Sequence, residues 1–182
     1  LVFDHKIILK RFLPKKGNIV LFCSSSIPVY PDPNEMTNFL DKLYYDAKKE
    51  LIKFKKKKHN INILSVSLPN VLGFRLAKEA NAKKMISVVP GANLSDSIYE
   101  SLVTWRQRED AAKKGFYHDD FKKALKNYVP ENYASFVPKG IKVYLSKWDG
   151  FIPFDQGSKL VDALKKKGKM PVVRVSNIWG HI

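Results

Sequence analysis

The stretch that decides the fold is INILSVSLPNVLGFRLAKEA, residues 61–80. Its first half is an apolar run of the kind that predicts a short buried strand. A helical pattern of apolar residues begins almost at once, at Val71, Leu72, Leu76, Ala77 and Ala80. Because no loop separates the two patterns, Ser67 is predicted to lie on a tight turn from strand to helix. Pro69 fits the first helical turn, where its missing N–H would have had no partner.

The same alternation of strand and helix patterns extends along the chain. Helices are predicted at residues 34–57 and 155–167, and Gly168 fits a helix C-terminus. Apolar runs predict strands at residues 6–12, 18–24, 60–66, 84–89, 141–146 and 171–176. The alternation predicts an α/β fold with a mostly parallel sheet. Since most strands are near-continuous apolar runs, both faces should be covered, giving a three-layer sandwich.

Two segments interrupt this alternation. Residues 28–33 hold three prolines directly after a predicted strand and are expected to form a loop. Residues 91–139 are long, polar and aromatic, and predict two or three short helices inserted between strands. An insertion of this size can form a small cap over a site. Ordinary covering helices are the alternative interpretation.

The predicted position of Ser67 is chemically informative. Ligands of open α/β sheets bind at the carboxyl ends of the strands, and amides at a helix N-terminus stabilise negative charge. A second pattern follows the predicted strand at 141–146, where KWDGFIP occupies residues 147–153. An amphipathic helix and another strand come next, and the following loop ends in Trp179, Gly180 and His181.

Together these motifs resemble the α/β-hydrolase family. That family places its nucleophile on a strand-to-helix turn written G-x-S-x-G, which matches Ser65-x-Ser67-x-Pro69 here with both glycines replaced. The C-terminal stretch resembles the family's acid loop, of D-x-x-[VI]-P type, and its Gly-His ending. The order Ser67, Asp149, His181 is the order found in the family.

The resemblance implies a cofactor-independent serine hydrolase of carboxylesterase type, acting on a small-molecule ester, thioester or amide. Ser67 would attack the carbonyl and form an acyl-enzyme, and His181 would take the serine proton and pass it to the leaving group. Asp149 would orient the imidazole and stabilise its cation. No metal is implied.

The resemblance also implies an oxyanion hole built from backbone amides. One donor would be the N–H of Leu68, directly after the nucleophile. The other would come from the loop after an earlier strand, where Ser25 and Ser26 are the candidates. Each such donor contributes on the order of 3 kcal/mol to stabilising the transition state.

Each candidate residue also has a structural interpretation. Ser67 could cap the following helix, and Asp149 could form a turn with Gly150. His181 could be a surface residue near the chain end, and Cys23 is expected in the core. The alternative base is His118, and the alternative acids are Asp96, Asp119 and Asp120.

Composition limits the class of protein further. A chain of 182 residues suits a single domain spanning residues 1–182, and a single cysteine excludes internal disulfides and multi-cysteine zinc sites. No apolar run is long enough to predict a membrane-spanning helix, so we expect a soluble, cytoplasmic protein.

The net charge of +16 raises a further alternative, a basic module that binds nucleic acid, an anionic membrane or another polyanion. Only five of the 33 cationic residues are arginine, the residue best suited to phosphate and base recognition. We therefore do not favour nucleic acid as a partner. A catalytically inactive binding protein of hydrolase fold is the remaining alternative, since both glycines of the nucleophile motif are replaced.

Overall fold

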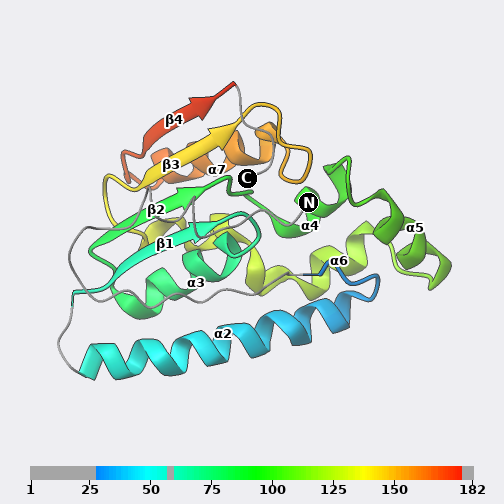
Figure 1. Ribbon diagram of the computed structural model, residues 1–182, viewed down its shortest axis with the longest axis horizontal. Helices are drawn as coiled ribbons and strands as arrows, with labels where there is room; N and C mark the ends of the chain where they lie inside the picture. The colour runs from blue at the N-terminus through cyan, green and yellow to red at the C-terminus, as the bar shows by residue number, and fades with distance from the viewer. Residues whose placement is uncertain (1–27, 57–59, 178–182) are drawn as a thin grey trace.

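The computed structural model describes residues 28–56 and 60–177. Its centre is a parallel four-stranded sheet in the order β1-β2-β3-β4 (Figure 1). The strands are β1 (Asn62–Val66), β2 (Lys84–Val88), β3 (Lys142–Ser146) and β4 (Val172–Ser176). These confirm four of the predicted strands. The strands predicted at 6–12 and 18–24, and Cys23, lie outside the described residues.

The register aligns the carboxyl ends of the strands. Val66 lies opposite Val88 in the pairing of β1 with β2, and Val88 lies opposite Tyr144 in the pairing of β2 with β3. Ser146 lies opposite Ser176 in the pairing of β3 with β4. Side chains in the loops after β1 and β3 are therefore brought to one edge of the sheet, which we call the carboxyl edge.

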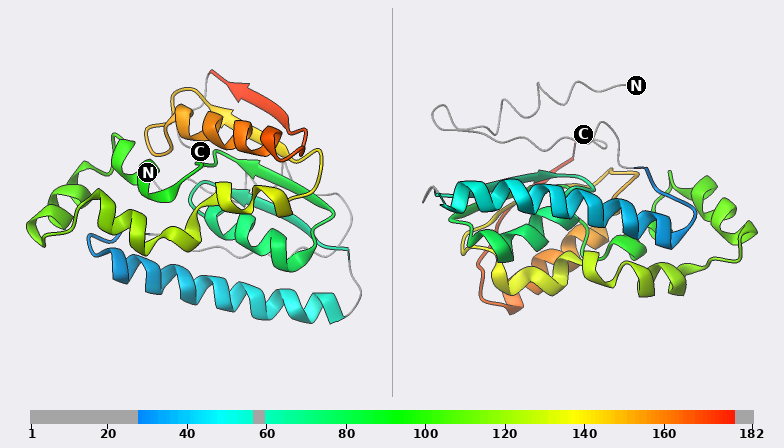
Figure 2. Two further views of the ribbon diagram at one scale, coloured as in Figure 1. Left: turned by 180° about the vertical axis from the view of Figure 1, so that it is seen from behind. Right: turned by 90° about the horizontal axis from the view of Figure 1, so that it is seen from below.

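Three long amphipathic segments form the predicted helices α2 (Pro33–Lys56), α3 (Asn70–Ala80) and α7 (Phe154–Lys166). Pro33, predicted as loop, instead begins α2, where a helix tolerates its missing N–H. After α7, Gly168 has φ +68°, which confirms the predicted helix end. Figure 2 shows α3 and α7 on the same side of the sheet. Phe74 of α3 and Leu160 and Leu164 of α7 are buried in one core.

The segment 91–139 holds α4 (Leu94–Glu100), α5 (Trp105–Lys113), α6 (His118–Ala124) and two 3₁₀ helices, η1 (Lys126–Tyr128) and η2 (Pro130–Phe136). Its second half belongs to the helical layer. Ala134 joins the core between the sheet and α7, while Phe121 and Tyr128 pack with Met36 and Leu40 of α2. This half is therefore a covering layer, and a cap formed by the first half stays a prediction.

The sheet is parallel and flanked by helices, as predicted for a three-layer α/β sandwich. No helix in residues 28–56 and 60–177 is long and apolar enough to cross a membrane. The same ranges contain no cluster of three or more His, Cys, Asp or Glu side chains able to hold a metal ion.

Candidate functional site

Ser67 occupies the tight turn predicted between β1 and α3. Its φ is +60°, the left-handed region that residues other than glycine seldom adopt. Its amide N–H donates to the carbonyl of Val88 at 2.9 Å, and its own carbonyl accepts from the amide of Asn70 at 2.9 Å. The N-cap residue of α3 is Pro69, which makes no side-chain capping bond. The turn therefore bends the chain sharply at Ser67, directly before the start of α3.

Asn70 is the centre of a buried hydrogen-bond network below this turn. Asn70 is only 1% exposed to solvent. Nδ2 donates to the carbonyls of Ser67 and Val88, both at 2.8 Å. Oδ1 accepts from Ser65 Oγ at 2.6 Å and from Ser87 Oγ at 2.5 Å. All the hydrogen-bonding capacity of the amide is used, so Asn70 connects the ends of two strands to the first turn of α3.

Sequence analysis did not identify Asn70. The signal available was an amide residue within the apolar stripe of a helix, next to Val71 and four residues before Phe74. Both neighbours are buried, so a polar residue on this face needs internal hydrogen-bond partners. The identity of those partners depends on β2, which is distant in the sequence from the turn.

Gly73 explains how the turn tolerates Ser65 where the α/β-hydrolase pattern has glycine. A Cβ added at Gly73 would lie 2.7 Å from both Cβ and Oγ of Ser65. The strand and helix therefore approach so closely that only one of the two positions can carry a side chain. In this chain the glycine lies on the helix, and the serine lies on the strand.

The amide of Leu68, the expected oxyanion donor, lies at the start of α3. Within residues 28–56 and 60–177, the Leu68 N–H donates to no backbone or side-chain acceptor. An amide at this end of a helix is suited to binding an anion or a developing oxyanion. Ser25 and Ser26, the other expected contributors, lie outside the described residues.

Asp149 lies in the loop after β3 and is only 8% exposed. Its Oδ1 accepts from the amides of Phe151 at 2.8 Å and Ile152 at 2.9 Å. Asp149 therefore forms a turn in the loop that contains Gly150, which is the structural interpretation of this residue. The same two bonds fix the orientation of the carboxylate, which a triad acid also requires.

The structure brings Ser67 and Asp149 to the same edge of the sheet. Hydrogen bonds at this edge run from the Ser67 amide to Val88, from the Val89 amide to Tyr144 at 2.7 Å, and from the Lys147 amide to Ser176 at 3.0 Å. They connect the ends of all four strands, with β2 lying between the two candidate residues (Figure 1). The chain leaves β4 at this edge, and His181, five residues after Ser176, lies outside the described residues.

The alternative base and one alternative acid meet elsewhere. His118 Nε2 lies 3.0 Å from Asp96 Oδ1, and the ring of Tyr99 stacks on the imidazole at a centroid distance of 4.3 Å. Asp120 accepts from the amide of Tyr117 at the start of α6, at 2.8 Å. The His118–Asp96 pair therefore joins α4 to α6, and Asp120 caps α6. Asp119 is exposed.

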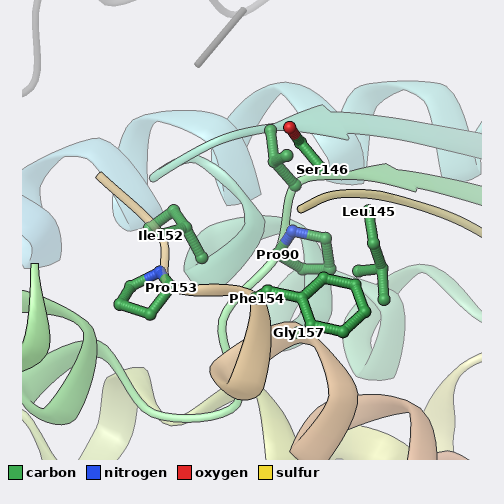
Figure 3. A pocket seen from close by; sticks show the side chains of 8 residues that line it. Pro90, Leu145, Ser146, Ile152, Pro153, Phe154 and Gly157 are labelled. Carbon is green, nitrogen blue, oxygen red and sulfur yellow. The ribbon is translucent and has the colours of Figure 1, made fainter. Parts of the chain in front are cut away.

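A small cavity lies beside the candidate acid loop (Figure 3). Its volume of about 10 Å³ has room for roughly one water molecule. The lining residues are Val89, Pro90, Leu145, Ser146, Ile152, Pro153, Phe154 and Gly157. A wider groove of about 220 Å³ lies between α7 and the strands β3 and β4. Neither Ser67 nor Asp149 lines these two spaces.

Val89 is a second backbone exception at this edge. Its φ is +43°, a left-handed value that is unusual for a β-branched residue. Val89 follows β2 directly, so two adjacent strands end in left-handed residues, Ser67 and Val89. Such strained positions cluster at functional sites, where the surrounding structure holds them.

No protein-family model matches this chain, and no curated protein is significantly similar to it in sequence. Solved structures do resemble it. Acylaminoacyl peptidase from Pyrococcus horikoshii matches with a TM-score of 0.60 and 18% identity over 76% of this chain and 23% of the peptidase. An esterase from Pyrococcus furiosus matches with a TM-score of 0.53 and 15% identity over 78% of this chain and 55% of the esterase.

A third resemblance is to acetyl xylan esterase 1 from Thermoanaerobacterium, with a TM-score of 0.54 and 13% identity. This match covers 68% of the chain and 40% of the esterase. The chain thus spans about a quarter to about half the length of these structures. At such low identity the likeness concerns the fold. The parallel sheet, the flanking helices and the similarity to these solved structures show that the chain has the α/β-hydrolase fold.

Proposed function

We propose that this chain is a serine hydrolase that cleaves an ester, thioester or amide bond through an acyl-enzyme. The observation that carries the proposal is Ser67 in a left-handed turn between β1 and α3, at the carboxyl edge of the sheet. The solved structures of similar fold include a peptidase and esterases, which supports the reaction class.

In this proposal Ser67 Oγ attacks the substrate carbonyl while His181 takes the hydroxyl proton. The carbonyl oxygen becomes an oxyanion beside the Leu68 amide, whose position at the start of α3 suits this charge. Collapse of the tetrahedral intermediate breaks the bond to the leaving group, which receives the proton from His181. Water then attacks the acyl-enzyme by the same steps in reverse, releasing the acid and restoring Ser67.

Asp149 would orient the imidazole of His181 through Nδ1. The carboxylate is suited to this role because two backbone amides already hold Oδ1 in one orientation. Low exposure also keeps the carboxylate away from competing water. We therefore expect Asp149→Asn to lower turnover more than it lowers stability.

The test is turnover of p-nitrophenyl acetate and butyrate by the native chain and by Ser67→Ala. We expect kcat to fall at least about 1,000-fold in the variant. Ser158→Ala, a serine of α7 outside the site, is the matched control and should retain native turnover. Equal rates for native protein and Ser67→Ala would remove Ser67 from the mechanism.

The second candidate is a catalytically inactive binding protein with the same fold. It is favoured by one specific observation, the replacement of both motif glycines by Ser65 and Pro69. A fluorophosphonate probe distinguishes the two candidates. Covalent labelling at Ser67 that is absent from Ser67→Ala would exclude the inactive protein.

A further inference from the structure

The loop that carries Asp149 is contacted by a segment of the insertion. We call this loop, residues 147–153, the acid loop, and we call residues 101–104, between α4 and α5, the link (Figure 1). The carbonyl of Gly150 accepts from the Leu102 amide at 3.1 Å and from Ser101 Oγ at 2.9 Å. Ser101 and Gly150 are 49 residues apart in the sequence. The link therefore makes a tertiary contact directly beside the candidate acid.

Ser101 is well suited to hold the Gly150 carbonyl. The residue is only 1% exposed, so water does not compete for its hydroxyl. Its Oγ donates to Gly150 and accepts from the Val103 amide at 3.3 Å. Because a serine hydroxyl has one proton to donate, the donor capacity of Ser101 is committed to the acid loop.

The position of Ser101 is fixed from within the insertion. Its own amide donates to the carbonyl of Ser97 at 3.1 Å, in the last turn of α4. Arg108 Nη1 donates to the carbonyls of Ser101 at 2.7 Å and Tyr99 at 2.9 Å. A cation suits this end of a helix, where the last carbonyls lack intrahelical partners. The link is therefore an ordered support with contacts of its own.

A second contact lies just beyond the acid loop. Gln156, in the first turn of α7, is fully buried, and its Nε2 donates to Glu100 Oε2 at 2.8 Å. Glu100 Oε1 also lies 3.5 Å from Lys159 Nζ. Since Glu100 directly precedes Ser101, the C-terminal end of α4 contacts both the acid loop and the helix that follows it.

Side-chain packing contributes little to the order of the acid loop. Trp148 is 72% exposed and Phe151 is 46% exposed. Of residues 147–153, only Asp149 and Ile152 are buried. A segment with few buried apolar contacts opens easily unless hydrogen bonds hold it. The hydrogen bonds from the link should therefore decide how firmly this loop is held.

We propose that Ser101 is a positioning residue for the acid of the triad. By holding the Gly150 carbonyl, its hydroxyl keeps the neighbouring Asp149 carboxylate in one orientation. That carboxylate must face the imidazole to stabilise the cation formed during proton transfer. The holding of the acid loop does not depend on catalysis, while its effect on turnover rests on the function proposed above.

The first test is amide hydrogen exchange, measured by NMR on the native chain and on Ser101→Ala. The amides of Phe151 and Ile152 report the orientation of Asp149, because they donate to its Oδ1. Both amides should exchange at least about tenfold faster in the variant. The slowest amides of the sheet, which report global unfolding, should change less.

Ser97→Ala is the matched control. Ser97 is 2% exposed and lies one turn earlier in α4, where its Oγ donates to the carbonyl of Asn93 at 2.8 Å. The substitution removes the same kind of bond without touching the acid loop, so exchange of the Phe151 and Ile152 amides should stay at the native rate. In the native chain, the amides of Leu102 and Phe151 should share one dependence on urea, as parts of one unit.

The second test is turnover of p-nitrophenyl acetate across pH by folded Ser101→Ala. We expect kcat to fall at least about fivefold, since a poorly oriented carboxylate stabilises the imidazolium less. For the same reason the acid limb of the kcat/KM profile should move to lower pH. A loss of folded protein would lower the rate at every pH without moving this limb. Ser97→Ala should keep the native profile.

Native exchange rates for the Phe151 and Ile152 amides in Ser101→Ala would overturn the proposal. Equal acceleration in Ser97→Ala or in the slowest sheet amides, or different urea dependences in the native chain, would do the same. Faster exchange with native kcat and an unmoved acid limb would overturn the role in turnover. If the native chain shows no Ser67-dependent turnover, the hydrolase proposal fails, and exchange still decides whether Ser101 holds Asp149.

Discussion

At the scale of single residues, the left-handed backbone of Ser67 requires compensation from its neighbours. A non-glycine residue in this region costs on the order of 1–3 kcal/mol. Asn70 offsets the cost by donating from Nδ2 to the carbonyls of Ser67 and Val88. Gly73 removes the remaining steric obstacle by leaving space for Ser65. The turn is therefore built from these residues in place of the two motif glycines.

We expect Asn70→Asp to impair Ser67 more than it impairs the fold. The variant keeps the size of the side chain and the acceptor for Ser65 and Ser87, but places a carboxylate oxygen against the two carbonyls that Nδ2 now serves. Loss of these donated bonds should cost about 1–3 kcal/mol in the free energy of unfolding. The rate constant of fluorophosphonate labelling, measured where the protein is fully folded, should fall at least about tenfold.

Leu164→Ala is the control for this prediction. Leu164 is fully buried near the C-terminal end of α7, away from the turn, and its truncation should cost about 2–5 kcal/mol. Its labelling rate in the folded protein should stay at the native value. If Asn70→Asp labels at the native rate while losing stability, Asn70 has a purely structural role.

Gly73 and Ser65 should show strong coupling in a double-mutant cycle. Gly73→Ala alone places a Cβ 2.7 Å from Ser65 and should destabilise the fold by about 1–3 kcal/mol. Adding Ser65→Gly removes the clash, so the double variant should regain most of this loss. The measurement is denaturant unfolding of the four proteins. Additive effects of the two substitutions would show that the close approach does not limit the turn.

At the scale of elements, α2 is joined to α3 by a polar cluster beside the apolar contacts. Tyr44 Oη donates to Glu79 Oε1 at 3.0 Å, and Lys48 Nζ lies 3.4 Å from Glu79 Oε2. Burial works to raise the pKa of Glu79, but the hydrogen bonds from Tyr44 and Lys48 outweigh it and leave the pKa lowered. Burial and the same contact with Glu79 raise the pKa of Tyr44.

This shift predicts a pH-dependent contribution to stability. Because the pKa of Glu79 is lowered on folding, its carboxylate stabilises the fold above its ordinary pKa of 4.5, and this contribution is lost as the pH falls through the folded value. Glu79→Gln should therefore lower the free energy of unfolding at neutral pH, and the difference from the native protein should shrink in acid.

The matched substitution is Glu50→Gln on α2, where Glu50 contacts Lys53 of the same helix at an exposed position. Its effect should be small at every pH, since exposed pairs contribute little. Urea unfolding at neutral and acidic pH measures both variants. A constant difference between Glu79→Gln and the native protein across this range would contradict the assignment.

At the scale of the whole molecule, positive charge gathers at the edge opposite the candidate site. Lys84 begins β2 and Lys142 begins β3, while the Gly140 amide donates to the carbonyl of Lys169 at 2.8 Å and joins their loops. The lysines at this edge are Lys83, Lys84, Lys139, Lys142, Lys165, Lys166, Lys167 and Lys169. Among the described residues of this edge, Asp162 pairs with one of them, Lys165, at 3.5 Å.

We expect this basic edge to bind polyanions weakly and without selectivity. Lysine is a point charge that lacks the planar fork of arginine, and solvated charges are screened over about 10 Å at 0.1 M salt. Retention on heparin should therefore disappear by roughly 0.5 M salt. Charge reversal at Lys139, Lys142 and Lys169 should lower it further without changing ester turnover. Retention that resists salt would instead indicate a dedicated polyanion site.

Much of the architecture follows from local patterns. The four described strands, the helices α2, α3 and α7, and the turn at Ser67 are all predicted from the spacing of apolar residues and the lack of a loop before Val71. Pro33 was predicted in a loop but begins α2, because proline suits the start of a helix as well as a loop. The likeness of Asp149 to a triad acid came from its motif, and its bonds to Phe151 and Ile152 became visible only in three dimensions.

Periodicity was sufficient for the fold class and for placing Ser67 and Asp149 after parallel strands, because strand direction brings carboxyl ends to one edge whatever the intervening chain. The partners that hold the site were decided by the tertiary structure. Asn70 finds Ser87 on a neighbouring strand, Gly73 makes space for Ser65, and Leu102 reaches Gly150 from a separate insertion. Such contacts join residues distant in the chain, and their energies depend on distances of a few ångströms that packing alone determines.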